Sequence, residues 1–302
     1  MAQLRTAGAD RGVFYAAFGF FLASILFSLA GAALLHYAPA AAAPTLAWIA
    51  VNLGVGLETL IKAPTWLNMA VLPVIAFALF FRELGTDSGG NFDRGRAWRR
   101  SLAFLLAGSA IGAGAELVGT QTGFPFGAYS YGDFLGPKIA GHVPWLIPPS
   151  WYALSIVSYD LGRRLGAGAA GRVAGTALFM VLWDAALDPA MNYAFPFWKY
   201  DGGGAYFGMP LSNWAGWALT SLAIGAAYEF ALGGMRPAPE AFVRRWSPTF
   251  YAANSLFSVG VCLAYGAPLA ALAGATGLAA ALALVRFRRG TTSTAAAPAP
   301  AT

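Results

Sequence analysis

Long runs of apolar residues separated by short polar segments dominate the chain. A membrane-spanning helix needs about 20 mostly apolar residues, within a range of about 17–25. Runs that approach or reach this length are Phe14–Leu35, Thr45–Ile61, Leu67–Phe81, Ser101–Val118, Val143–Leu161, Val173–Leu187 and Leu211–Leu232. The stretch Tyr251–Val285 is too long for one span and predicts a hairpin of two short helices that turns at Gly266–Pro268. The pattern predicts an all-α, polytopic membrane helical bundle of about eight transmembrane helices, within limits of roughly seven to nine.

These runs predict one transmembrane helical domain over residues 13–289, preceded by an N-terminal tail at 1–12. Because further spans follow Phe14–Leu35, this first run is expected to be an anchor rather than a signal peptide. Residues 290–302 are rich in Thr, Ala and Pro, which cannot build a packed core, so a disordered C-terminal tail is expected.

Composition supports a membrane protein and excludes several kinds of site. Hydrophobic residues make up 58% of the chain and charged residues 11%, whereas soluble domains carry about 25% charged residues. The single cysteine, Cys262, excludes an intrachain disulfide. Two histidines are too few for a multi-histidine iron site.

Basic residues cluster in alternate loops and give the chain a net charge of +6. The positive-inside rule places these loops on the cytoplasmic side of a cell membrane, and the excess charge therefore orients the chain rather than binding nucleic acid. The loops at 119–142 and 189–210 then share the opposite face. Three full spans before Arg82 would place Arg5 and Arg11 on the wrong side, unless one of the two segments between Thr45 and Phe81 is re-entrant.

The two outer loops, with the helix ends that flank them, occupy residues 116–151 and 184–217 and follow the same order of features. Each has a carboxylate at a helix end, then Phe-Pro-Phe, then a glycine shortly before Val-Pro or Met-Pro, and finally a helix that bears tryptophan. This order predicts a weak internal repeat whose two halves face each other. The alternative is a pair of aromatic interface belts, which would explain the aromatic residues but neither the carboxylates nor their repeated order.

Three carboxylates in these segments are candidates for acid–base chemistry. A carboxylate near mid-membrane costs on the order of 3 kcal/mol on insertion scales and is a functional candidate by default. Glu116, Asp184 and Asp188 have no basic residue within one helical turn, and the two aspartates share a helix face that Pro189 is expected to end. The alternative role is structural hydrogen bonding to neighbouring helices.

Other polar signals carry less functional weight. Asp160 lies four residues before Arg164, which predicts a solvated ion pair at a helix end. The glycine pattern at 166–171 lacks the preceding strand of a dinucleotide-binding fold. The spacing of Asp184 and Asp188 is similar to a motif of membrane prenyltransferases, but those enzymes carry a second aspartate-rich motif that this sequence lacks.

As a set, the loop motifs resemble those of the CruF-type carotenoid hydratases, which are integral membrane proteins. The matching segments are Thr122–Tyr131, Val143–Pro144, Asp188–Pro189, Trp198, Tyr206–Pro210 and Asn213–Trp217. The resemblance covers about a third of the chain, from Glu116 to Trp217. It implies that water is added across the terminal C1–C2 double bond of an acyclic (ψ) end group, in a γ-carotene- or lycopene-like carotenoid, to give a tertiary alcohol.

The candidate residues suit this chemistry. Protonation of such an alkene by a carboxylic acid leaves a tertiary carbocation, which a second carboxylate quenches by activating water. We expect either Asp188 or Glu116 to be the acid and the other to be the base, with Asp184 supporting Asp188. Aromatic faces can shield the cation, and Tyr129, Asn192 and Tyr206 are candidates for holding the water. The aromatic candidates are Phe124, Tyr129, Trp151, Phe195, Trp198 and Tyr206.

The expected partners are a carotenoid within the bilayer, water and membrane lipids, and the reaction needs no metal, flavin or nicotinamide. Two alternatives remain from the sequence. A carotenoid end-group cyclase would begin with the same protonation but trap the cation with the polyene. A transporter or lipid-binding membrane protein would use the repeat to build a binding site near mid-membrane.

Overall fold

The computed structural model describes residues 2–166, 168–194 and 196–294, which are mostly helical. The α-helices are α1 (Ala2–Tyr37), α2 (Pro39–Leu53), α3 (Leu57–Gly85), α4 (Arg94–Thr122), α5 (Ile147–Arg163), α6 (Gly168–Asp188), α7 (Ser212–Ala226), α8 (Ala241–Ala264) and α9 (Pro268–Thr294). The four short strands are β1 (Tyr129–Tyr131), β2 (Lys138–Ile139), β3 (Val143–Pro144) and β4 (Trp198–Tyr200). A 3-10 helix, η1 (Asp133–Leu135), and two π-helical segments, η2 (Pro189–Ala194) and η3 (Ala227–Ala231), complete the elements.

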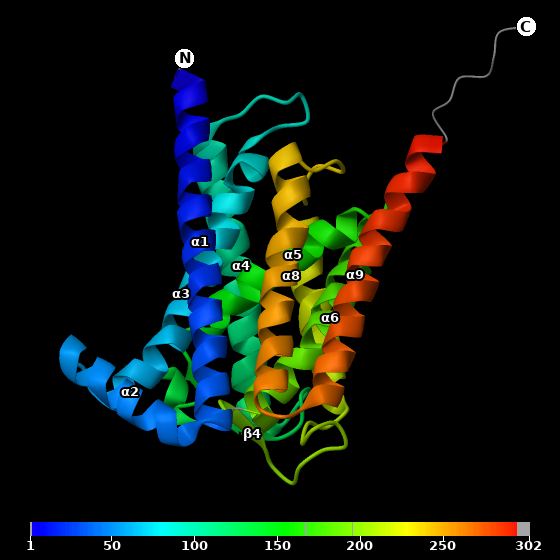
Figure 1. Ribbon diagram of the computed structural model, residues 1–302. Helices are drawn as coiled ribbons and strands as arrows, with labels where there is room; N and C mark the ends of the chain where they lie inside the picture. The colour runs from blue at the N-terminus through cyan, green and yellow to red at the C-terminus, as the bar shows by residue number, and fades with distance from the viewer. Residues whose placement is uncertain (1, 167, 195, 295–302) are drawn as a thin grey trace, which may run out of the picture.

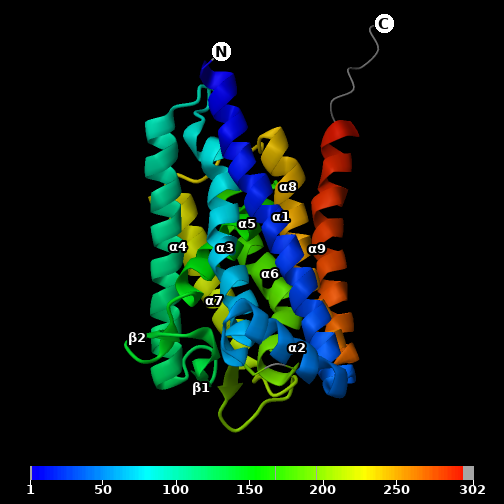
Figure 2. The same cartoon turned by 60° about the vertical axis from the view of Figure 1, so that its left-hand side comes forward.

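Long helices packed side by side form the body of the molecule, as Figures 1 and 2 show. Within the part of the chain that the structure describes, five helical segments are long and apolar enough to cross a membrane: Arg11–Tyr37, Lys62–Gly85, Arg94–Thr122, Gly168–Ala194 and Pro268–Arg286. The predicted all-α polytopic membrane fold is confirmed. The predicted hairpin also forms, between α8 and α9, and Gly266 adopts a positive φ of 73° in its turn. Its helices have 24 and 27 residues, so they are not short.

Helix α2 differs from the predicted span Thr45–Ile61. The helix ends at Leu53, Gly54 takes a left-handed φ of 67°, and α3 begins at Leu57. With 15 residues, α2 is shorter than a spanning helix, and Figure 1 shows it projecting sideways from the lower end of α1, away from the body of the bundle. Only α1 therefore runs through the bundle before α3, so the start of α1 lies at the same end as the arginine-rich loops. The re-entrant alternative for the segment before α3 stays a prediction.

Three other boundaries differ from the sequence prediction. Val143 and Pro144 form β3, and the following helix begins only at Ile147. Residues 2–12, expected as a tail, belong to α1, and α9 extends to Thr294, into the segment expected to be disordered. The rest of that C-terminal segment, 295–302, lies outside the described residues.

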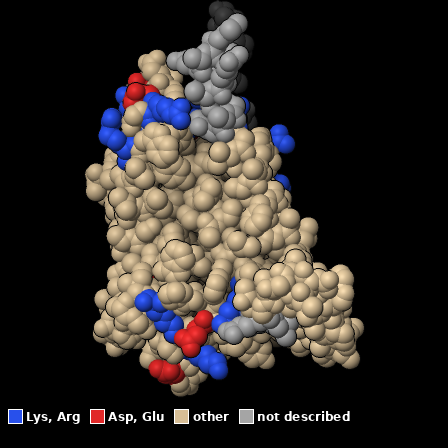
Figure 3. All heavy atoms as spheres, turned by 90° about the vertical axis from the view of Figure 1, so that its left-hand side faces the viewer, with Lys and Arg blue, Asp and Glu red and all other residues tan. Residues whose placement is uncertain are grey.

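Charged side chains gather at the two ends of the bundle, and a broad uncharged band separates them in Figure 3. The arginines lie at or near the end where α1 begins and α9 ends, whereas Lys62, Lys138 and Lys199 lie at the opposite end with the strands. This asymmetry is the one that the positive-inside rule describes.

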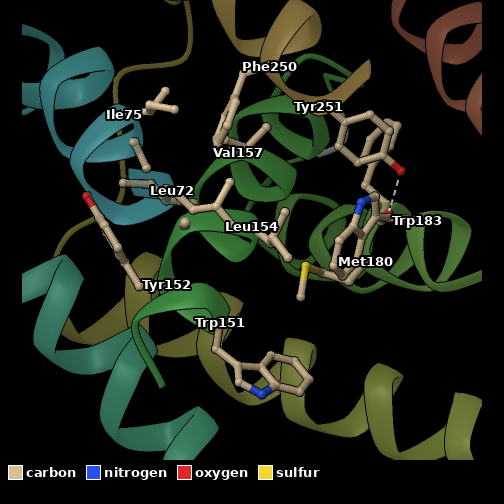
Figure 4. Packing of buried hydrophobic residues seen from close by; sticks show 14 of the residues in the cluster. Leu72, Ile75, Trp151, Tyr152, Leu154, Val157, Met180, Trp183, Phe250 and Tyr251 are labelled. Carbon is tan, nitrogen blue, oxygen red and sulfur yellow. Dashed lines mark hydrogen bonds between the residues drawn. The ribbon is translucent and has the colours of Figure 1, made fainter. Parts of the chain in front are cut away.

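Helix α5 forms the centre of the bundle, because its residues are buried almost without interruption from Trp151 to Arg163. A helix that is apolar on all sides is typical of such a position. In Figure 4, Leu154 and Val157 of this helix lie among side chains from α3, α6 and α8. Tyr251 of α8 donates a hydrogen bond of 2.7 Å to the Phe179 carbonyl and so ties α8 to α6.

A buried ion network closes the arginine end of the bundle. The side chain of Arg163 is fully buried and donates to Glu83 at 2.8 Å and to Asp160 at 2.7 Å. Arg164 also pairs with Asp160, and Arg236 pairs with Glu83 at 3.2 Å. The Asp160–Arg164 pair was predicted to be solvated. It forms, but Asp160 is buried, and its two arginine partners also donate to Glu83 of α3 and to the Val243 carbonyl of α8.

Candidate active site

The two motif loops meet in a small antiparallel sheet at the lysine end of the bundle. Strand β1 pairs with β4, so that Tyr129 lies opposite Tyr200 and Tyr131 opposite Trp198. Side chains at alternate strand positions point to the same face, and both tyrosines of β1 are buried while Ser130 between them is exposed. The first and third side chains of the two strands therefore point into the bundle.

Glu116 of α4 is buried and accepts three hydrogen bonds. Tyr129 and Tyr131 of β1 both donate to its Oε2 atom, Tyr131 at 2.9 Å. The indole Nε1 of Trp151, on α5, donates to Oε1 at 2.9 Å. Charge-assisted donors of this kind stabilise an ionised carboxylate away from water.

Asp188, the last residue of α6, has an equivalent set of partners. Its Oδ1 atom accepts from Trp198 Nε1 at 2.8 Å and from the Tyr200 hydroxyl at 2.9 Å, both on β4. Asn213 of α7 donates to Oδ2. Each carboxylate thus takes two donors from the strand that follows its helix and one from the next helix. The predicted repeat corresponds to a local two-fold arrangement of α4–β1–α5 and α6–β4–α7.

The tyrosine donors keep their protons at neutral pH. Burial, and then the neighbouring carboxylates, raise the pKa of Tyr129, Tyr131 and Tyr200 well above the ordinary value for tyrosine. These hydroxyls therefore act as donors to Glu116 and Asp188 rather than as competing anions.

Asp184 lies one turn before Asp188 on the same face of α6 and is fully buried. Its Oδ2 atom accepts from Asn213 Nδ2 at 3.3 Å, so the amide of Asn213 bridges the two aspartates. Its Oδ1 atom has no hydrogen-bond partner within the described part of the chain. Among these described residues, no group of three or more His, Cys, Asp or Glu side chains is placed to hold a metal ion.

Glu116 and Asp188 line the same cavity of about 120 Å³, which is otherwise mostly apolar. Trp151 and Trp217 stack in its wall with ring centroids 4.3 Å apart, and Trp183 meets Trp217 edge-on at 5.7 Å. Two buried amides also line it and have an unpartnered atom each among the described residues, Asn68 through Oδ1 and Asn254 through Nδ2. The cavity therefore combines two carboxylates, an aromatic wall and two polar groups free to bind a small polar molecule.

Comparison with known proteins places the chain in a family. A family model described as "Carotenoid biosynthesis protein" matches residues 67–281, which include both motif loops and all three carboxylates. The chain belongs to the carotenoid biosynthesis protein family. It is 34% identical over 137 residues to the bisanhydrobacterioruberin hydratase of Haloarcula japonica. That match covers 44% of this chain and 46% of the relative, so the chain spans about half the length of the curated relative it matches.

The resemblance to CruF-type carotenoid hydratases is confirmed by these two matches. No solved structure matches the chain.

Only some of the site residues expected from the sequence line the cavity of this protein. Tyr129, Trp151 and Trp198 line the cavity with Glu116 and Asp188. Phe124 is 67% exposed, and Phe126 lines the cavity in its place.

Two further expected residues bind backbone instead of lining the cavity, and one cannot be placed. Asn192 donates to the Phe207 carbonyl at 3.0 Å, and Tyr206 donates to the Ala185 carbonyl at 2.7 Å. Phe195 lies outside the described residues.

The sequence interpretation missed Tyr131, Tyr200, Asn213 and Trp217 as site residues. Tyr131 lies two positions after Tyr129, a spacing that places both on one face of a strand, and this signal was available. Asn213 and Trp217 were part of the matching motif, but nothing in their spacing shows which carboxylate they approach. The contacts of Tyr200 depend on the pairing of β1 with β4, which only the fold supplies.

Helices α4 and α5 pack closely at Gly112, so replacing this glycine is expected to lower the stability of the protein. A Cβ atom at this position would lie 2.6 Å from Cβ of Trp151. We expect Gly112→Ala to displace Trp151 from Glu116, to lower the unfolding free energy by about 1–3 kcal/mol and to reduce activity. Gly114→Ala on the same helix meets no atom within 4 Å and serves as the control. Equal thermal midpoints for the two variants in detergent would contradict the prediction.

Proposed function

We propose that this protein hydrates the terminal C1–C2 double bond of an acyclic (ψ) carotenoid end group within the cell membrane, giving a tertiary alcohol. The observation that carries the proposal is the pair of carboxylates, Glu116 and Asp188, on the wall of one aromatic cavity. Membership of a carotenoid biosynthesis family, and a relative named as a hydratase, support it. Lycopene- and γ-carotene-like molecules carry the required end group.

The reaction adds one water and transfers no electrons. A carboxylic acid delivers a proton to C2, which leaves the positive charge on the tertiary carbon C1. The oxygen of water bonds to C1, and a carboxylate takes the proton that water releases. The proton gained by this carboxylate returns to the acid before the next turnover, so the enzyme is unchanged.

We assign the acid to the Asp184–Asp188 pair and the base to Glu116. Asn213 bridges the two aspartates, and like charges held this close disfavour double ionisation, so the pair retains one proton. Asp188 faces the cavity and delivers that proton, while Asp184 lies behind it. Glu116 and Asp188 each accept three hydrogen bonds, so these bonds do not distinguish the two roles. Only Asp188 has a second carboxyl group one helical turn away from which it can draw a proton, which leaves Glu116 as the base.

The rest of the cavity supports the cation and the water. The stacked faces of Trp151 and Trp217 supply aromatic π-electrons beside the place where the charge develops. The unpartnered amide atoms of Asn68 and Asn254 offer hydrogen bonds to the attacking water. These amides take the role that the sequence interpretation gave to Asn192 and Tyr206.

The product's mass tests the proposal most directly. Expressed in a bacterium that accumulates lycopene or γ-carotene, the protein should raise the mass of the carotenoid by one water. An unchanged mass with a shifted absorption band would instead indicate an end-group cyclase. Pigment that is bound but never changed would indicate a transport or binding protein. A strain with the empty vector is the control.

A further inference from the structure

A second cavity of about 110 Å³ adjoins the candidate active site. The two cavities share Thr65, Met191, Phe197 and Phe257 in their walls, so they are neighbouring compartments on the two sides of these residues. Asn68, which lines the first, donates at 3.3 Å to Ser28, which lines the second. The junction therefore lies between α1, α3 and α8.

The second cavity leads from the carboxylates toward the outside of the bundle. Its walls come mainly from α1 and α8, with Leu46 of α2 and Pro64 of α3. Phe27 on its rim is 54% exposed, and Leu26 beside it is 68% exposed, in the apolar band where a membrane helix faces lipid. Helix α2, whose Leu46 lines this cavity, projects sideways from the lower end of α1 in Figure 1.

The chemistry of the lining fits an apolar chain better than water. Ser28, Thr65 and Tyr265 are its polar residues, and the hydroxyl of Ser28 already accepts from Asn68. Apolar cavities do not hold ordered water, since a water molecule needs two to four polar partners. A conjugated polyene, by contrast, is apolar, thin and rigid, so it needs a straight passage in line with its end group.

We propose that the second cavity holds the polyene chain of the carotenoid while its end group occupies the first, and that the substrate enters sideways from the bilayer between α1 and α3, where Leu46 of α2 also lines the cavity. This inference rests on the proposed function, because it takes the same molecule as the occupant of both cavities. The remainder of the polyene lies in the surrounding lipid, and Gly31 of α1 keeps the passage open because it has no side chain.

Gly31 makes the inference testable without overpacking the protein. A Cβ atom at Gly31 meets no protein atom within 4 Å, and Gly31 lines the second cavity. Gly31→Leu should therefore fill the passage without a clash and improve the helix propensity of α1. Gly19→Leu is the matched control: it lies on the same helix, has the same open space and lines neither cavity.

The experiment measures both bound carotenoid and hydrated product in lycopene-accumulating cells, after the expression levels of the variants have been matched. Gly31→Leu should lower both by at least about tenfold, because blocking groups in an apolar site discriminate on that scale. Gly19→Leu should stay within about twofold of wild type. Gly31→Ala, which adds one methyl group, should give an intermediate loss. Should Gly31→Leu accumulate poorly, Ala32→Leu fills the same cavity and is measured in its place.

The outcomes separate this inference from the proposed function. Normal binding and hydration by Gly31→Leu would overturn the polyene passage and leave the hydratase proposal standing. If the wild-type protein binds lycopene but never hydrates it, the hydratase proposal fails, and the bound pigment still reports whether Gly31→Leu blocks the passage. Equal losses in Gly31→Leu and Gly19→Leu would show a general effect on α1 and would also overturn the inference.

Discussion

Asp188→Asn is expected to lower the rate of carotenoid hydration by about 10³-fold, within the range for loss of a general acid. Asparagine keeps the size of the side chain and can still accept hydrogen bonds from Trp198 and Tyr200, but it has no proton to deliver to the alkene. The rate is followed as product of increased mass per unit of purified protein. The loss should appear in kcat with little change in KM, because the aromatic wall that binds the end group is intact.

Asp201→Asn is the control for this experiment, because Asp201 follows β4 directly and is exposed. It should hydrate carotenoid at the wild-type rate. A near-normal turnover by Asp188→Asn would remove Asp188 as the acid. If Glu116→Gln alone were then inactive, the acid and base roles would have to be exchanged.

Arg163→Met is expected to lower the stability of the protein by about 3–5 kcal/mol, the usual cost of removing one partner from a buried ion pair. The change leaves Glu83 and Asp160 buried with less compensation, at the point where α3 and α5 meet. The thermal midpoint in detergent should fall by roughly 5–10 °C. Because this network lies at the opposite end of the bundle from the carboxylates, the folded fraction should keep its hydration activity.

Arg244→Met supplies the matched comparison, since this arginine has an exposed side chain at the same end of the bundle. Exposed charges contribute about 0–1 kcal/mol, so its thermal midpoint should stay near that of wild type. Similar midpoints for the two variants would show that the buried network adds little to stability.

Much of the fold could be predicted from local patterns. The lengths of the apolar runs locate most of the membrane-spanning helices. Gly266 and Pro268 predict the turn between α8 and α9. The span predicted over Thr45–Ile61 failed because hydropathy alone does not detect a break of three residues around Gly54. The burial of Asp160 could not be foreseen either, since its arginine partners also bind residues more than 70 positions away in the sequence.

The candidate site was predictable in its carboxylates and less so in its walls. An unpaired acid in an apolar segment is costly, so the sequence alone marks Glu116, Asp184 and Asp188 as candidates, whatever their contacts. The walls depend on which side chain of a motif turns inward. Phe126 rather than Phe124 does so because Gly119 and Gly216 leave room for its ring, and such a fit between separate segments has no local signal.

The two-fold arrangement around β1 and β4 has a consequence for the origin of the protein. Duplication and fusion of a gene for one helical hairpin would produce two units of this kind, each with an inward carboxylate, a strand of donors and a tryptophan or asparagine on the returning helix. Each unit provides only one side of the cavity. A single hairpin with this arrangement would therefore complete the cavity only as a symmetric dimer. In the present chain the two carboxylates differ, because Asp184 lies one turn before Asp188, whereas Gly112 occupies the equivalent position before Glu116.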